Sequence, residues 1–135
     1  GHIFFADRYF GFDDAIYAAA RLLEILVQEG KSLRELLADV PLTYVTPEIR
    51  MPCPDDAKFA VVDHVRRHYE ATHKVSSVDG ARVDFGEGAW GLCRASNTGP
   101  VLVLRFEALT AERRDALRAD FERVVENAKK EQGIA

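Results

Sequence analysis

The residues of this chain best suited to chemistry lie in one polar segment, residues 94–100, between two apolar runs typical of strands. An arginine, two hydroxyl side chains, a carboxamide and a glycine occur there, as Arg94, Ser96, Thr98, Asn97 and Gly99. Arginine offers a planar, permanently charged fork that matches phosphate oxygens, and hydroxyl and amide groups donate hydrogen bonds without adding charge. Gly99 lets the backbone approach a ligand closely. The segment indicates an anion-binding loop. From composition alone, however, the favoured interpretation is an ordinary polar hairpin loop whose arginine pairs with a surface acid, and the anion-binding loop is the alternative.

Two histidines, His64 and His68, have the i, i+4 spacing of a metal-binding pair on a helix. The residues between them include Arg66 and Arg67, whose adjacent guanidinium groups repel a divalent cation. A solvated, half-basic helix face is therefore the favoured interpretation of this segment.

Three other features have structural interpretations that the sequence favours over catalytic ones. The acid pairs at positions 13–14 and 55–56 lie where helices are expected to begin, so helix capping is preferred to paired-carboxylate chemistry. Cys93, beside Arg94, is either a thiol of lowered pKa or a small core residue, and its place in a central strand favours the core. Glu87 lies in a Gly-Glu-Gly turn one strand away from the polar loop, and a plain hairpin turn is preferred to a ligand contact.

Composition limits the class of protein. The 135 residues are 47% apolar and 30% charged with a formal net charge of −4, which suits one globular domain or one domain plus part of another. The mild acidity argues against a nucleic-acid partner, because binding to the phosphate backbone needs clustered positive charge. The two cysteines, Cys53 and Cys93, lack CxxC spacing and indicate a reduced compartment, the cytoplasm. The sequence contains no run of 18 apolar residues, so no membrane-spanning helix is predicted.

The first 40 residues predict part of a larger domain. Aromatic-rich residues 3–10 predict one strand or a tight strand pair, and residues 13–29 predict a helix that is apolar on nearly every face and should be largely buried. Ser32 and Glu35 form a capping box that begins a short helix over residues 32–39. Because one strand pair cannot cover such a helix, we expect residues 1–40 to be the end of an α/β domain. Residues 41–45, with Pro41, are expected to form a hinge.

Residues 46–135 predict a second domain. The expected elements are an edge strand within residues 44–51, a helix over 54–71, a hairpin of 75–78 and 81–85 around Asp79 and Gly80, strands over 90–94 and 101–107, and a helix from Thr110 to about 130. This order predicts an α+β fold, with an antiparallel sheet and two helices on one face.

Several segments carry a resemblance to a known enzyme family. They are residues 1–5 (Gly-His-Ile-Phe-Phe), 10–14 (Phe-Gly-Phe-Asp-Asp), 79–83 (Asp-Gly-Ala-Arg-Val), 90–92 (Trp-Gly-Leu) and 94–108 (Arg-Ala-Ser-Asn-Thr-Gly-Pro-Val-Leu-Val-Leu-Arg-Phe-Glu-Ala). Together they resemble the C-terminal part of the α-D-phosphohexomutases, specifically the bacterial phosphomannomutase/phosphoglucomutase branch. The resemblance spans essentially the whole chain, and the Arg-Ala-Ser-Asn-Thr loop with the strand after it is its most specific part.

The resemblance implies a four-domain isomerase of carbohydrate metabolism. Such an enzyme interconverts hexose 1-phosphates and hexose 6-phosphates through a phosphoserine and a bisphosphorylated sugar, with Mg²⁺ on an aspartate-rich loop. The phosphoserine and metal loops are absent from this sequence, so we expect an inactive fragment that lacks the N-terminal domains of the same enzyme. Residues 46–135 match the fourth domain, of TATA-binding-protein-like topology, which closes over the active site.

The resemblance also implies roles for individual residues. Arg94, Ser96, Asn97 and Thr98 fall on the loop that grips the non-transferring phosphate of the hexose phosphate substrate. At Gly99 relatives often have Thr or Glu, so only the backbone N–H is expected to donate there.

His2 matches the end of the sugar-recognition loop, whose Glu, Met and Ser are absent here. A sugar-binding role is implied, although a remnant of a purification tag is an alternative for a second residue. Whether His2 transfers protons, which hexose phosphate is preferred and which oligomer forms all stay open at this point.

A second class of function, an interaction module without catalysis, is an alternative to the enzyme. An uncovered apolar helix at residues 13–29 would favour self-association, as in a non-catalytic interaction or oligomerisation module. Nucleic-acid binding by analogy with the TATA-binding-like topology is disfavoured by the net charge, and analogy of fold is weak support for a function.

Overall fold

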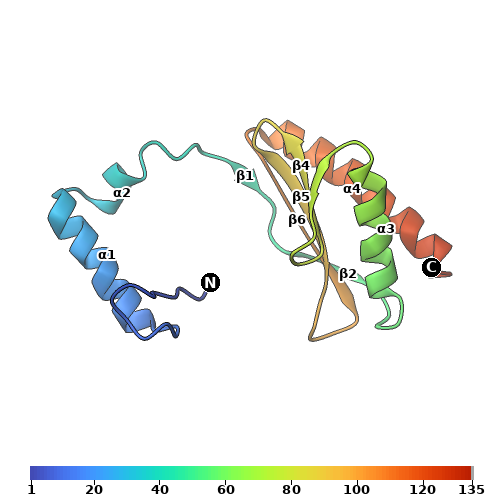
Figure 1. The fold of residues 1–135 in the computed structure, drawn as a ribbon. Helices are drawn as coiled ribbons and strands as arrows, with labels where there is room; N and C mark the ends of the chain where they lie inside the picture. The colour runs from blue at the N-terminus through green and yellow to red at the C-terminus, as the bar shows by residue number, and fades with distance from the viewer. Residues whose placement is uncertain (135) are drawn as a thin grey trace. The chain divides into compact units, whose positions relative to one another are not determined.

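The computed structural model describes residues 1–134, which fall into two compact units, residues 1–41 and residues 42–134. The first unit holds helix α1 (Ala15–Glu29) and the short helix α2 (Leu33–Leu36), and the second holds the other helices and the six-stranded sheet (Figure 1).

Both predicted helix starts in the first unit are confirmed. The Asp14 side chain accepts hydrogen bonds from the backbone N–H groups of Ile16 and Tyr17, at 2.9 and 3.0 Å, and so caps α1. Ser32 and Glu35 form the expected capping box at the start of α2, although this helix ends at Leu36 rather than near residue 39.

The strand predicted for residues 3–10 is wrong. Within the described residues, this segment makes only one isolated bridge, between Phe4 and Asp13. Its aromatic side chains instead cluster against α1, where the rings of Tyr9 and Tyr17 stack with their centroids 4.0 Å apart. A strand needs a neighbouring strand to take up its backbone hydrogen bonds, and β-propensity alone does not provide one.

The expected burial of the helix at residues 13–29 is also wrong for this chain. No residue of α1 is buried, and Ile16 and Val27 keep 85% and 81% of their surface exposed. The apolar residues of α1 lie on several sides of the helix, whereas the first unit supplies only the aromatic cluster of residues 5–17 as cover.

The second unit confirms the predicted antiparallel sheet with two helices on one face. Its strands are β1 (Tyr44–Val45), β2 (Ile49–Pro52), β3 (Lys74–Ser76), β4 (Ala81–Gly86), β5 (Ala89–Ala95) and β6 (Val101–Ala108). They pair in the order β1-β6-β5-β4-β3, all antiparallel, and β2 also pairs with β6. Helices α3 (Lys58–Glu70) and α4 (Ala111–Glu131) cover the same face (Figure 1).

The core lies between this face and the two helices. Alternate residues of β5 are buried, ending with Cys93 and Ala95, while Trp90, Leu92 and Arg94 are half-buried on the other face. The rings of Phe106 and Phe121 meet edge to face over β5, with their centroids 5.3 Å apart. Gly91 makes room for both rings, because a Cβ atom there would lie 3.1 Å from each of them.

The two helices of this unit begin differently from one another. The Thr110 hydroxyl accepts the N–H of Arg113 at 3.2 Å, as predicted for the start of α4. Capping of α3 by Asp55 or Asp56 is wrong, because the N-cap is Ala57 and no side chain caps this end. The Pro54 carbonyl accepts the first backbone N–H groups instead. None of the helices within residues 1–134 is long and apolar enough to cross a membrane.

We expect Gly91→Val to lower the free energy of unfolding by about 1–3 kcal/mol, because the added methyl groups overpack the site between the two buried rings. Urea denaturation measures this effect. Gly99→Ala is the matched control, since a Cβ at Gly99 meets nothing within 4 Å. Equal stability of the two variants would contradict the packing argument.

Candidate functional site

The polar segment predicted to bind an anion is the connection between β5 and β6. The strands on either side are confirmed, and their last pairs are Arg94 with Val103 and Ala95 with Leu102. Figure 1 shows this connection at the end of the sheet where α3 begins. The antiparallel pairing therefore brings the two ends of residues 96–100 together.

Ser96 shapes the loop from inside. It is buried, and its Oγ atom accepts the backbone N–H of Thr98 at 3.2 Å and lies 3.2 Å from the hydroxyl oxygen of the same threonine. The N–H of Ser96 donates to the carbonyl of Val101 at 3.0 Å, and the N–H of Val101 donates to the carbonyl of Gly99 at 2.9 Å. The Ser96 hydroxyl is thus used within the loop.

The groups left over face outward. Asn97 and Thr98 are exposed, and a Cβ atom at Gly99 would point into open space. Within residues 1–134, the backbone N–H groups of Asn97 and Gly99 have no hydrogen-bond partner. The tip of the loop therefore presents two backbone donors and the Asn97 carboxamide to solvent.

Arg94 lies at the base of the loop, on the sheet face away from the helices. Its guanidinium is 3.8 Å from the Asp79 carboxylate, too far for a hydrogen bond but close enough for electrostatic attraction. Gly80 has φ +84°, and a Cβ atom there would lie 2.4 Å from the Cys93 carbonyl oxygen and 2.7 Å from Cα and Cβ of Arg94. The predicted Asp79-Gly80 turn therefore packs directly against Arg94, a contact that the sequence pattern does not reveal.

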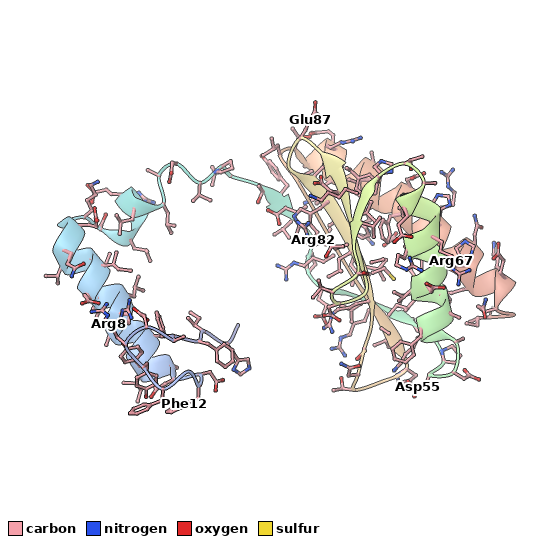
Figure 2. All side chains as sticks on the ribbon, in the orientation of Figure 1. Arg8, Phe12, Asp55, Arg67, Arg82 and Glu87 are labelled. Carbon is pink, nitrogen blue, oxygen red and sulfur yellow. The ribbon has the colours of Figure 1, made fainter. Side chains whose placement is uncertain are left out.

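Lys58 is the residue of this site that sequence reasoning missed. Its Nζ donates to Asp55 Oδ1 and to the Ser96 carbonyl, both at 2.6 Å, and reaches the Gly99 carbonyl at 3.4 Å. Figure 2 labels Asp55 near the start of α3, beside the loop. A lysine three residues after an aspartate is a common surface ion pair, so nothing in the sequence marks Lys58 as buried against a distant loop.

The remaining candidates from the sequence are Glu87, His64 and His2. Glu87 (φ +52°) belongs to the β4–β5 turn at the opposite end of the sheet (Figure 2), about 20 Å away along β5 at the usual rise per residue. His64 pairs with Glu131, at 3.0 Å from Nδ1 to Oε2. His2, in the first unit, is exposed and contacts Asp13. Across residues 1–134, no group of three or more side chains could hold a metal ion.

Cys93 is a core residue, as the sequence favoured, and its alternative role as an activated thiol is wrong. The side chain is fully buried on the helix-covered face, whereas Arg94 next to it projects to the other face. Burial raises the pKa of the Cys93 thiol from its ordinary 9.0 to about 12. Burial also raises the pKa of Cys53.

Comparison with known proteins gives matches over both units. Residues 48–124 match the family model described as the phosphoglucomutase/phosphomannomutase C-terminal domain. Residues 1–44 match the phosphoglucomutase/phosphomannomutase alpha/beta/alpha domain III.

Individual relatives agree with these models. A phosphomannomutase/phosphoglucomutase of Pseudomonas aeruginosa is 47% identical to this chain, in an alignment that covers 90% of the chain and 26% of the relative. A phosphoglucomutase of Neisseria meningitidis serogroup A is 42% identical, in an alignment that covers 94% of the chain and 28% of the relative. A solved phosphoglucomutase/phosphomannomutase family protein from Burkholderia thailandensis superposes with a TM-score of 0.76 at 38% identity, over 96% of this chain and 27% of that one. The chain therefore spans about a quarter of the length of these relatives.

The buried Cys93 thiol predicts a loss of stability at high pH. Between pH 9 and 12 the unfolded chain releases the Cys93 proton while the folded chain retains it, so the free energy of unfolding falls by up to about 1.4 kcal/mol per pH unit from this group. Urea denaturation at pH 8, 9 and 10 measures this slope. In Cys93→Ala the slope should be shallower by that amount, and identical slopes in the two proteins would disprove the assignment.

Proposed function

Because the chain belongs to the phosphoglucomutase/phosphomannomutase family, we propose that residues 94–99 bind the non-transferring phosphate of a hexose phosphate substrate. The whole enzyme, in this proposal, interconverts hexose 1-phosphates and hexose 6-phosphates through a phosphoserine and a bisphosphorylated intermediate. The phosphoserine belongs to parts of the enzyme outside this chain. The contribution of this chain is to hold and orient the substrate.

One observation carries the proposal: the loop turns its unpaired donors outward beside an arginine. The N–H groups of Asn97 and Gly99 have no partner among the described residues, and the Arg94 guanidinium is not engaged by a hydrogen-bonded carboxylate. A phosphate dianion is bound well by a positive fork combined with neutral N–H donors that need no rearrangement. An ordinary hairpin loop has no need of this combination.

The geometry suggests different roles within the loop. Arg94 supplies charge, and Asn97 donates through its backbone and its carboxamide. Ser96 and Thr98 bond to one another, so the Ser96 hydroxyl keeps the turn in shape and the Thr98 hydroxyl retains its second hydrogen-bonding direction for the anion. Gly99 donates through its backbone alone.

Three further elements of the proposal rest on family resemblance. His2 is proposed to contact the sugar, which is compatible with its exposed side chain. Mg²⁺ is proposed to act in the whole enzyme, bound by residues outside this chain. A cytoplasmic location is the third element.

A second candidate function is self-association or partner binding without catalysis. The observation that favours it is the exposure of apolar side chains along α1, such as Ile16, Leu23 and Val27. Sedimentation of the chain distinguishes the two candidates, because a strict monomer at high concentration removes the support for this one.

We expect a titration with glucose 6-phosphate, followed by NMR, to shift the backbone amides of residues 94–99 first. Arg94→Ala should weaken this binding at least about tenfold, since it removes a charged, forked donor. Arg105→Ala is the matched control, because Arg105 is an exposed arginine on the next strand and the same sheet face. Shifts confined to residues 64–73 would contradict the proposal.

We also expect no mutase turnover of glucose 1-phosphate by the isolated chain, because the phosphate donor of the proposed reaction lies outside it. A coupled assay for glucose 6-phosphate measures the activity. The control is the same preparation carrying Arg94→Ala, which reveals contaminating enzyme. Turnover that disappears with this substitution would refute the assignment of the chemistry to other parts of the protein.

A further inference from the structure

We propose that Lys58 is a positioning residue for the loop, which turns the peptide between Ser96 and Asn97 so that the Asn97 N–H faces the bound anion. This inference rests on the proposed phosphate-binding function of residues 94–99. Lys58 itself does not touch the substrate in this proposal.

The first step is that all three ammonium donors of Lys58 are in use. The side chain is only 7% exposed, and its partners are the Asp55 carboxylate and the carbonyls of Ser96 and Gly99. A buried ammonium with three partners has no donor left for a substrate phosphate. Lys58 therefore acts on the loop and not directly on a ligand.

The second step follows from the planarity of the peptide bond. The described residues contain no cis peptide bond, and in a trans peptide the carbonyl and the N–H point in opposite directions. The Ser96 carbonyl points to Lys58, 2.6 Å away, so the N–H of Asn97 in the same peptide points away from the protein interior. That N–H is one of the two unpaired donors at the loop tip.

The third step concerns the carbonyl oxygens, which repel an anion. Lys58 draws the carbonyls of both Ser96 and Gly99 to the inner side of the loop. With the Ser96 carbonyl turned inward, the unpaired Asn97 N–H lies on the outer side of the loop, where an N–H group can face an anion as in other anion-binding turns. Because Asp55 lies 2.6 Å from the same ammonium, the charge of Lys58 is largely balanced. The contribution of Lys58 is therefore to orientation more than to long-range attraction.

The test compares Lys58→Met with Lys129→Met in the full 135-residue chain, with inorganic phosphate as the probe. Lys129 is the matched control, because its side chain is about as buried as that of Lys58, at 8% exposed. Its Nζ donates to Glu126 and not to the loop. We expect phosphate affinity, from NMR shifts of the loop amides, to fall about tenfold or more in Lys58→Met and to change less than about twofold in Lys129→Met. Lys58→Arg should restore affinity, since its fork can reach the same carbonyls.

A measurement on the unchanged chain covers the case in which Lys58→Met does not fold. The Lys58 ammonium should give a signal protected from exchange, with scalar coupling across the hydrogen bond to the Ser96 carbonyl carbon, and the Asn97 amide should show one of the largest shifts with phosphate. Absence of the coupling, or an unmoved Asn97 amide when other loop amides shift, overturns the inference.

The outcomes also separate this inference from the proposed function. If phosphate binds the loop and Arg94→Ala abolishes binding while Lys58→Met binds normally, only the role of Lys58 fails. If phosphate does not shift residues 94–99 of the unchanged chain at all, the proposed function itself fails.

Discussion

The antiparallel pairing of β5 with β6 places Ala95 opposite Leu102, so both ends of the polar loop lie at the same end of these two strands. Both strands are held in register by the core beneath them, where Phe106 and Phe121 close over Gly91. A shift of one residue would turn Cys93 to solvent and Arg94 into the core. The position of the loop therefore depends on the packing of the sheet against α4, well away from the loop itself.

Much of the second unit could be predicted from its sequence, because its signals are local. The Asp79-Gly80 turn, the alternation of β5 and the Thr110 cap each involve residues close along the chain. The polar loop could be recognised in the same way. The contact of Lys58 with the Ser96 carbonyl joins residues 38 positions apart, and no local pattern encodes it. The same holds for the approach of Gly80 to Arg94.

In the first unit, by contrast, local sequence patterns led to wrong predictions. Aromatic residues 3–10 and the apolar surface of α1 have the composition of buried elements, yet the unit contains neither a partner strand for the first nor a full cover for the second. These patterns indicate that the segments need neighbours to pack against. In this unit the aromatic cluster of residues 5–17 supplies part of that packing, for example where Phe5 and Tyr9 contact Tyr17. The relatives that match this chain are much longer than the chain itself, which covers 26% and 28% of their lengths.

The hydrogen bonds that hold the loop also bear on the thermodynamics of the anion binding that we propose for it. The Ser96 N–H bonds to the Val101 carbonyl, the Pro100 carbonyl accepts the Cys53 N–H at 2.9 Å, and Lys58 crosses between Ser96 and Gly99. Backbone held at both ends and across the middle has already lost most of its conformational entropy during folding. Capture of an anion then requires little further ordering, so more of the contact energy remains as affinity. The remaining ordering cost of the proposed binding would therefore come mainly from the lost translational and rotational freedom of the ligand.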